Sequence, residues 1–386
     1  MTLPTDDTAL PSDSRRRLLF VSPCTPDPQG TGWEQRAYSL LLAYSRFMAV
    51  ELWFMPTPDN PELTRMSPLA KLCRSITAFY PSVVNDERTG FKARLVERLS
   101  SADVVHVFRF QEFVRNIDHP CIVWDIDELP WHSRPADEGA GEQPIAGDQL
   151  DRLKADFARC VGKCRVIIGC SRLERPADRA EFKVVPNVAR RPSCAGAATA
   201  VRERRLLFVG NLNYLPNIDG LAFFKDQVLP LLEQIVADVE VVVVGRAPVT
   251  ERARAAVARL RQSSRIRFDF DVPDCTPHYA RSAVSIAPIR LGGGTRVKII
   301  EAFAHRCPVV STSKGCEGLD VEHGRQLLIA DSAQAFAQAC AELLRDPSLR
   351  ARIADSAHGF SEREHAQQVV DTLLASTLRG LLQHRH

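Results

Sequence analysis

The sequence lacks several features that define common classes of protein. No apolar run approaches the roughly 20 residues that a membrane-spanning helix requires. The 50 basic and 47 acidic residues leave a net charge of only +3, which argues against nucleic-acid binding through bulk charge. The apolar stretch "LLFVSP" near the start is too short for a signal peptide and has no small-residue cleavage site after it. We therefore expect a cytoplasmic protein that does not bind nucleic acid.

The eleven cysteines also lack the spacing of a recognisable cysteine site. No Cys-x-x-Cys pair occurs, and Cys160, Cys164 and Cys170 lie in or beside apolar stretches without nearby histidines. A free cysteine in an apolar element behaves as a small hydrophobic residue, and reduced thiols are typical of the cytoplasm. We expect neither a disulfide framework nor a structural metal site.

Short apolar runs alternate with helical patterns along the chain, in two successive blocks. The first block holds "RLLFVSP", "VELWFMP", "VVHVFRF", "CIVWDID" and "CRVIIGCS", with helical segments expected near 68–80, 91–100 and 148–162. The second block restarts at "RLLFVGNLNY" and "VEVVVVG". Such alternation predicts parallel sheets covered by helices, and 386 residues exceed what one core normally holds. The fold class is α/β: two Rossmann-like domains with a ligand cleft between the carboxyl edges of their sheets.

Composition sets the expected domain boundaries. The stretch "VVPNVARRPSCAGAATAVRERR" has proline, small and charged residues but no periodicity, which is typical of a linker. We expect a disordered tail at residues 1–14, an N-terminal domain at 15–188, a linker at 189–204 and a C-terminal domain at 205–360. A last helix at 361–386 is expected to pack back toward the N-terminal domain.

A glycine-rich segment, "IRLGGGTRVKIIEAF" at residues 289–303, precedes an apolar helix. It is neither a Walker A loop nor a dinucleotide fingerprint, because Val297 replaces the third glycine of Gly-x-Gly-x-x-Gly. Glycines let backbone N–H groups converge on an anion, and the helix N-terminus adds partial positive charge. Arg296 and Lys298 therefore favour a diphosphate, and Glu301 suits ribose or sugar hydroxyls. A flexible turn with solvated charges is the alternative interpretation.

The longer stretch "PIRLGGGTRVKIIEAFAHRCPVVSTSKGCEGLDVEHGRQLLIAD" resembles the C-terminal half of GT-B glycosyltransferases of family 4, the group 1 glycosyltransferases. It is most similar to a bacterial subgroup associated with exopolysaccharide and other surface glycans. The resemblance implies a GT-B fold and transfer of a sugar from a nucleoside diphosphate sugar to a glycan or lipid-linked acceptor, with retention. It further implies no metal and no cofactor besides the donor.

The resemblance also implies roles for individual residues. Glu301 matches the second glutamate of the family's Glu-x7-Glu motif, which holds the ribose, whereas the first glutamate falls on Gly293. Arg296 and Lys298 then take over the diphosphate charge, because the family's Arg/Lys pair after the "VGxL" strand is missing. Gly30 and Gly32 are implied to let the first loop close over the phosphates. Asp271 and Val272 are implied to contact the base. The implied contacts with the donor sugar and phosphates are Gly292, Gly293, Gly294 and Thr295.

Several features allow two interpretations. His106 has two interpretations. Either it touches the donor sugar, as a histidine of the family often does, and is then catalytic together with Arg296, Lys298 and Glu301, or it belongs to the core. Asp125, Asp127 and His132 either line the acceptor side of the cleft or cap helices, and metal binding by this Asp-x-Asp is the less favoured third reading. The segments "LAKLCRSITAFY" and "RTGFKARLVERL" lie either on the inner membrane, which suits a lipid-linked acceptor, or against solvent.

Two other functions fit the expected architecture. A nucleotide-sugar 2-epimerase would need acid/base carboxylates and histidines in the cleft. A nucleotide-sugar-binding protein without catalysis would be compatible with the missing first glutamate. Assays for epimerisation, hydrolysis and transfer distinguish the three.

Overall fold

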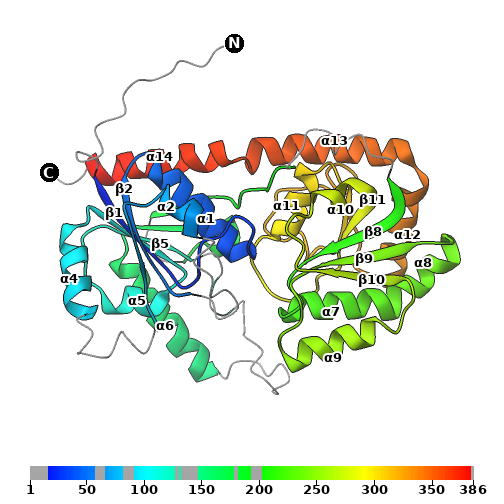
Figure 1. The fold of residues 1–386 in the computed structure, drawn as a ribbon, viewed down its shortest axis with the longest axis horizontal. Coiled ribbons are helices and arrows are strands. Elements are labelled where there is room, and N and C mark those ends of the chain that lie inside the picture. Colours follow the sequence, from blue (N-terminus) through cyan, green and yellow to red (C-terminus); the bar gives the residue numbers. More distant parts are fainter. Residues whose placement is uncertain are drawn as a thin grey trace, which may run out of the picture.

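The protein forms two α/β domains joined side by side, each built on one parallel sheet (Figure 1). This computed structural model describes residues 16–56, 66–80, 91–126, 129, 131, 147–177, 181–192 and 202–383. The expected tail at 1–14, together with Asp127 and His132, lies outside the described residues. When the strands are numbered within each domain, both sheets contain the order 3-2-1-4-5-6, which is that of a Rossmann-like fold.

The N-terminal sheet has seven strands in the order β3-β2-β1-β4-β5-β6-β7. Its central strands are apolar and buried on both faces, as expected for a parallel sheet covered by helices on each side. The strands are β1 Arg17–Ser22, β2 Ala49–Phe54, β3 Ser75–Ala78, β4 Val104–Phe108, β5 Ile122–Asp125, β6 Val166–Gly169 and β7 Glu181–Val184. The helices are α1 Gly32–Ser45, α2 Met66–Ala70, α4 Phe91–Ser101, α5 Gln111–Asn116 and α6 Gly147–Lys163.

The C-terminal sheet has six strands in the order β10-β9-β8-β11-β12-β13. Alternate residues of β8 enter different cores: Leu206 packs with α8 and α12 on one face, and Leu207 with α11 on the other. The strands are β8 Glu203–Val209, β9 Glu240–Gly245, β10 Ile266–Phe270, β11 Ser282–Ala287, β12 Val309–Ser311 and β13 Leu328–Ile329. The helices are α7 Leu215–Phe223, η5 Phe224–Val228, α8 Leu229–Ile235, α9 Glu251–Leu260, α10 Thr276–Arg281, α11 Val297–Ala304 and α12 Ala333–Arg345.

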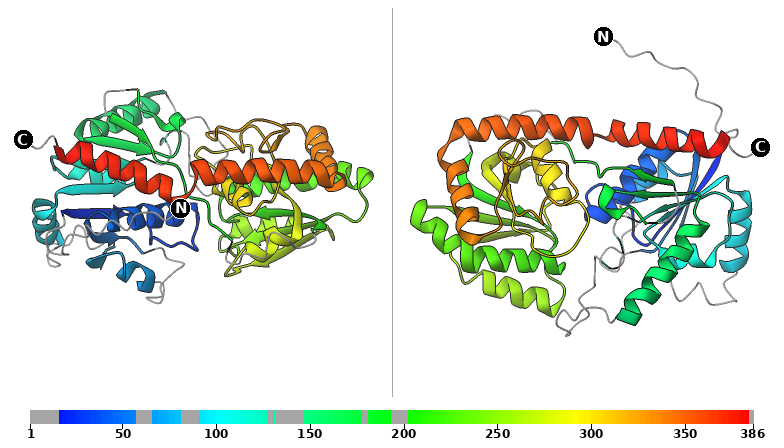
Figure 2. Two further views of the ribbon diagram at one scale, coloured as in Figure 1. Left: turned by 90° about the horizontal axis from the view of Figure 1, so that it is seen from above. Right: turned by 180° about the vertical axis from the view of Figure 1, so that it is seen from behind.

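Two long helices, α13 Pro347–Glu364 and α14 Gln367–Gln383, run along one side of both domains (Figure 2). Helix α13 packs against α11, whereas α14 packs against α1 and adds Val370, Leu374, Leu378 and Leu381 to the N-terminal core. The expected boundary at residue 361 falls inside α13, and the chain passes from one domain to the other between α13 and α14. The end of the chain thus packs on the N-terminal domain.

One expected helix is wrong. The basic segment near 68–80 forms only the short helix α2 and then the edge strand β3, which pairs in parallel with β2 from Glu51 opposite Ser75 to Phe54 opposite Ala78. Backbone pairing with a neighbouring strand outweighs the helical spacing of a few apolar residues. The other two expected helices are present as α4 and α6.

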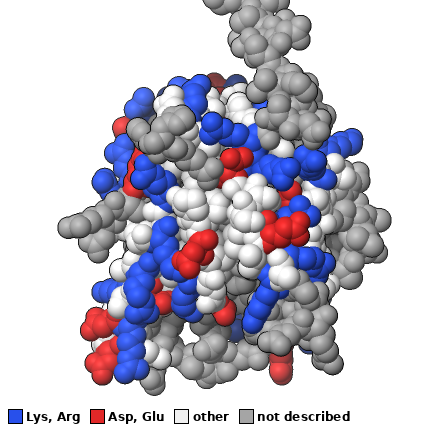
Figure 3. All heavy atoms as spheres, turned by 90° about the vertical axis from the view of Figure 1, so that its left-hand side faces the viewer, with Lys and Arg blue, Asp and Glu red and all other residues white. Residues whose placement is uncertain are grey.

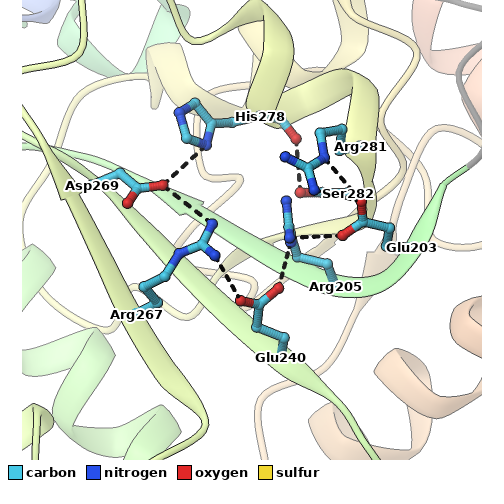
Figure 4. Close-up of polar contacts among 8 residues, drawn as sticks. All are labelled: Glu203, Arg205, Glu240, Arg267, Asp269, His278, Arg281 and Ser282. Carbon is cyan, nitrogen blue, oxygen red and sulfur yellow. Dashed lines mark hydrogen bonds and ion pairs between the residues drawn. The ribbon is translucent and has the colours of Figure 1, made fainter.

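A network of ion pairs joins β8, β9, β10 and α10 on the C-terminal domain (Figure 4). Arg205 is buried between Glu203 and Glu240, at 2.7 Å from each carboxylate, and Arg267 and Arg281 extend the network. Burial lowers the pKa of His278, which lies 3.6 Å from Asp269. Every charge of this network faces a partner, so we regard it as structural. None of the helices in the described part of the chain is long and apolar enough to cross a membrane.

Candidate functional site

A cleft of about 450 Å³ lies between the two domains. One wall is built from the carboxyl ends of β8 and β9 and the amino end of α11, and the other from the first loop and the start of α1. Most of the residues implied as donor contacts line it: Gly30, Gly32, Asp271, Val272, Gly293, Gly294, Thr295, Arg296, Lys298 and Glu301. The position agrees with the general rule that ligands of parallel sheets bind beyond the carboxyl ends of the strands.

The glycine-rich segment makes a tight turn between β11 and α11. Gly292 and Gly294 have φ angles of +79° and +74°, which only glycine adopts easily. Gly293, Gly294 and Thr295 line the cleft, and the hydroxyl of Thr295 accepts a 2.6 Å hydrogen bond from Asn187 Nδ2. Gly292 lies behind the cleft surface, where a Cβ atom would come within 2.9 Å of the Tyr214 hydroxyl. Its role is therefore to shape the turn.

The guanidinium group of Arg296 turns back onto this loop. Its Nη2 donates to the carbonyl of Leu291 at 3.0 Å, and Nη1 donates to the carbonyl of Gly293. Its Nε is buried without a hydrogen-bond acceptor among the described residues. Arg296 thus holds the glycine loop through two of its N–H groups, and its contact with a diphosphate stays a prediction.

Lys298 lies in the first turn of α11 and points toward β8. Its Nζ donates to Asn217 Oδ1 at 2.7 Å and lies 3.9 Å from the centre of the Phe208 ring. Gly210 makes room for it, because a Cβ atom there would approach Nζ to 2.9 Å. Burial, together with the charge of Arg296, holds the pKa of Lys298 well below its ordinary value. An anion in the cleft would favour the protonated lysine and so bind with it.

Glu301 lies one turn further along α11 and is almost fully buried. Its Oε1 accepts a 2.5 Å hydrogen bond from Arg190 Nε, and its Oε2 lies 3.4 Å from the hydroxyl of Tyr279. Arg190 belongs to the segment between the domains and also donates to Gln29 Oε1 of the first loop at 3.2 Å. A carboxylate at this depth, facing a cleft, is suited to accept hydrogen bonds from ligand hydroxyls.

The first loop contributes an ion pair that spans the cleft. Glu34 Oε2 accepts hydrogen bonds from Thr31 N at 2.6 Å and from Arg246 Nη2 at 2.8 Å, and Arg246 follows β9 in the other domain. A Cβ atom on Gly32 would lie 3.3 Å from Val297 Cγ2 of α11, so a glycine permits this close approach. Trp33 is 48% exposed and lies in the cleft.

The turn after β10 carries Asp271 and Val272. Asp271 has a φ angle of +53°, and its carboxylate accepts a hydrogen bond from the backbone N–H of Ala247 at 3.1 Å. Both residues line the cleft next to the carboxyl end of β9, on the C-terminal domain's side. Their contact with a base stays a prediction.

Of the two predictions for His106, the one that placed it in the cleft is wrong. Its ring is completely buried, stacks on Phe20 with 4.5 Å between centroids, and lies 3.0 Å from the Tyr44 hydroxyl through Nδ1. Burial lowers its pKa to about 3, so it is neutral at physiological pH. On a strand buried on both faces, His106 points to the core and not to a ligand.

Asp125 and Arg36 form a buried pair that supports the site from behind. The Arg36 guanidinium donates to Asp125 Oδ2 at 2.9 Å, to the carbonyl of Val185 at 2.9 Å and to Asn187 Oδ1 at 3.1 Å. Both side chains are at most 1% exposed. Asp125 is therefore a buried partner of Arg36, and it is not among the described residues that line the cleft. Among the described residues, no group of three His, Cys, Asp or Glu side chains is placed to hold a metal ion.

Several residues of the site are not predicted from the sequence, among them Asn187 and Arg190 of the interdomain segment and Arg246 after β9. The segment "VPNVARR" resembles a featureless linker because it has no periodicity. The available signal was position, since Arg246 directly follows a buried parallel strand, where ligand-binding residues are common.

Comparison with known proteins places this arrangement in context. Residues 203–346 match the family model described as glycosyl transferases group 1. A Klebsiella pneumoniae protein, described as an uncharacterized 44.6 kDa protein in the cps region, is 28% identical over 169 residues. That alignment spans 43% of this chain and 43% of the relative, so less than half of the relative is matched.

Solved structures resemble the whole chain. Sucrose-phosphate synthase from Thermosynechococcus elongatus has a TM-score of 0.69 at 16% identity, covering 96% of this chain and 100% of that one. Anabaena HepE in complex with UDP and glucose has a TM-score of 0.67 at 15% identity, covering 95% and 100%. The pneumococcal O-GlcNAc transferase GtfA in complex with UDP and GlcNAc has 0.66 at 9% identity, covering 96% and 99%. The expected GT-B fold is confirmed, and residues 203–346 match the group 1 glycosyltransferase family model.

Proposed function

We propose that this protein transfers a sugar from a nucleoside diphosphate sugar to a glycan or lipid-linked acceptor in surface polysaccharide synthesis, with retention at the anomeric carbon. The observation that carries the proposal is the amino end of α11, where the glycine loop, Lys298 and Glu301 face one cleft in a group 1 glycosyltransferase domain. The relative in a cps region supports the polysaccharide context. The UDP complexes of HepE and GtfA support a nucleotide donor.

The cleft supplies groups for each part of such a donor. Lys298 and the amino end of α11 face the diphosphate, Glu301 faces the ribose, and Asp271 and Val272 face the base. Arg296 holds the loop whose amides at Gly293 and Gly294 approach the donor sugar and phosphates, with the hydroxyl of Thr295 beside them. Gly30 and Gly32 let the first loop come close to the phosphates. Gly293 replaces the carboxylate that the family-4 pattern has there, so the sugar meets backbone amides instead.

The reaction follows from these roles. The bond between the anomeric carbon and the diphosphate oxygen breaks, and the electron pair leaves with the nucleoside diphosphate. Preorganised positive charge stabilises this leaving group, and here it comes from Lys298, the loop amides and the helix end. The acceptor hydroxyl attacks the same face of the sugar and passes its proton to a donor phosphate oxygen. This route uses no protein nucleophile, and we propose that it needs no metal or further cofactor.

A panel of nucleoside diphosphate sugars tests the proposal. Incubation with a lipid extract and a glycan panel is expected to release one nucleoside diphosphate and yield a glycosylated acceptor, both detectable by mass spectrometry and unaffected by EDTA. Glu301→Gln is expected to weaken binding of that diphosphate about tenfold to a hundredfold, because a charge-assisted hydrogen bond is lost. Trp33 lies in the cleft, so quenching of tryptophan fluorescence by the ligand measures the binding.

The control is Glu362→Gln, on α13 outside the cleft, which is expected to bind as the wild type does. Binding without turnover for any acceptor would support a binding protein instead, and equal affinity of Glu301→Gln would remove the proposed ribose contact. Release of an epimerised sugar would support the 2-epimerase. The described residues that line the cleft include no histidine, which argues against that acid/base chemistry.

The N-terminal domain has a basic end that suits a lipid-linked acceptor. Lys and Arg side chains gather around a strip of uncharged residues on this face (Figure 3), and α4 lies at the same end in Figure 1. We define the basic end by four exposed residues, Lys71, Arg74, Lys92 and Arg94, with Val96 of α4 64% exposed among them. We propose that it rests on the anionic inner membrane, with the protein on the cytoplasmic side.

Vesicle sedimentation tests the membrane proposal. Wild-type protein is expected to sediment with phosphatidylglycerol vesicles and not with pure phosphatidylcholine. Changing all four residues of the basic end to glutamate is expected to lower the bound fraction about tenfold or more, since each cation near an anionic surface contributes about 1 kcal/mol. The matched control changes four exposed arginines of and just after α9 to glutamate: Arg252, Arg254, Arg259 and Arg261. Equal loss in both variants would contradict a specific membrane face.

A further inference from the structure

Arg190 brings a positive charge from the interdomain segment into the cleft. The segment is fixed in place at each of its neighbours: Ala189 N donates to the carbonyl of His365 at 3.0 Å, and His365 Nδ1 lies 2.8 Å from the carbonyl of Asn187. Asn187 in turn bonds Thr295 of the glycine loop. The segment is thus a rigid part of the cleft, and the position of the Arg190 backbone is set by both domains.

The side chain of Arg190 is aimed at Glu301. Its Nε lies 2.5 Å from Glu301 Oε1, and the two side chains are 24% and 4% exposed. A buried carboxylate without a partner is costly, so this arginine balances the charge of Glu301. Burial alone would lower the pKa of Arg190, but the Glu301 carboxylate raises it above its ordinary value, so Arg190 stays protonated.

The two oxygens of Glu301 have different surroundings. Oε1 accepts the hydrogen bond from Arg190, whereas Oε2 receives only the long 3.4 Å approach of the Tyr279 hydroxyl among the described residues. A carboxylate held through one oxygen presents the other in a fixed direction, which is what recognition of a neighbouring hydroxyl pair needs. The alternative role for an arginine in this cleft is contact with the diphosphate, through the N–H groups that do not bond Glu301 and Gln29. The ligand comparison described below separates the two roles.

We infer that Arg190 is a positioning residue for the ribose of the nucleotide: it neutralises Glu301, fixes one oxygen of its carboxylate, and leaves the other to accept the ribose hydroxyls. This inference rests on the proposed function and assigns to the interdomain segment a share in nucleotide recognition. It predicts that loss of Arg190 lowers affinity through the ribose and not through the phosphates.

Calorimetry with UDP and 2′-deoxy-UDP tests the inference, with UDP as the probe because HepE and GtfA were solved with it. The wild type is expected to prefer UDP by about tenfold or more. Arg190→Met is expected to lower the affinity for UDP about tenfold and to change the affinity for 2′-deoxy-UDP little, so that the preference for UDP nearly disappears. Arg190→Lys, which keeps the charge, is expected to restore part of the preference.

The neighbouring residue provides a matched control. Arg191 is on the same segment but pairs with Glu362 at 2.8 Å outside the cleft, so Arg191→Met is expected to keep the wild-type preference. In a Glu301→Gln background, Arg190→Met is expected to have no further effect on UDP, since it acts through Glu301. Circular dichroism confirms that each variant is folded.

The possible outcomes separate the two proposals. If the wild type binds UDP and Arg190→Met weakens UDP and 2′-deoxy-UDP equally, Arg190 contacts the phosphates and the inference is overturned while the proposed function stands. Unchanged UDP affinity in Arg190→Met also overturns it. If the wild type binds no nucleoside diphosphate of the uracil, guanine or adenine series, the proposed function fails and the inference with it.

Discussion

Replacing Arg36 by methionine is expected to lower the free energy of unfolding by about 3–5 kcal/mol, because the substitution leaves the carboxylate of Asp125 buried without its partner. Arg36 also donates to the carbonyl of Val185 and to Asn187 Oδ1, so the segment that leads to the cleft loses hydrogen bonds as well. All four tryptophans lie between residues 33 and 131. Tryptophan fluorescence during urea denaturation therefore reports the unfolding of the N-terminal domain in particular.

Two variants serve as controls for this prediction. Arg115→Met removes the partner of Asp156 at a half-exposed position and is expected to cost less than about 1 kcal/mol. Combining Arg36→Met with Asp125→Asn is expected to be more stable than Arg36→Met alone, since no buried carboxylate is then left uncompensated. If Arg36→Met and Arg115→Met have equal midpoints of denaturation, the buried pair does not have the importance assigned to it.

Lys298→Met is expected to reduce kcat/KM for the donor about a hundredfold to a thousandfold. The ammonium group lies at the amino end of α11, where we propose that the negative charge of the leaving diphosphate develops, and loss of one such preorganised donor typically has this effect. The measurement is the initial rate of nucleoside diphosphate release. Lys225→Met, on η5 in the same domain and paired with Asp226, is the control and is expected to keep the wild-type rate.

Lys298 also predicts a pH dependence. Because burial and Arg296 lower its pKa in the free protein, Lys298 loses its proton at a lower pH than an exposed lysine does. In the proposed donor site the diphosphate binds the protonated form of Lys298, so affinity is expected to fall as the pH rises through that lowered pKa. In Lys298→Met this alkaline loss of affinity is expected to be absent. An unchanged pH profile in Lys298→Met would assign the titration to another group.

Much of the fold follows from local patterns in the sequence. Runs such as "VEVVVVG" are long enough for strands and too short for helices, and their alternation with helical patterns predicts parallel sheets. The exception was β3, where a few apolar residues at helical spacing were misleading because pairing with β2 is a nonlocal interaction. For weakly apolar edge strands, the local sequence preference is a poor predictor of secondary structure.

The glycine loop and the amino end of α11 were also predictable, since both depend on consecutive residues. Gly292 and Gly294 have the positive φ angles that a glycine-rich turn suggests, and Lys298 and Glu301 fall on the helix that follows. What the side chains contact was a different matter. The sequence does not show that the terminal nitrogens of Arg296 bond carbonyls of its own loop, and its contact with a diphosphate stays a prediction.

By itself, the sequence determined the α/β class, the two-domain organisation and the glycine-rich turn before α11, because periodicity, turn residues and helix ends are properties of neighbouring residues. Only the tertiary structure decided the partners of the charged groups: Arg190 meets Glu301 across 111 positions, and Arg36 meets Asp125 across 89. It also decided that His106 faces the core. Strand β4 is buried on both faces, so its residues carry no polar alternation that would distinguish the side facing a core from the side facing a cleft.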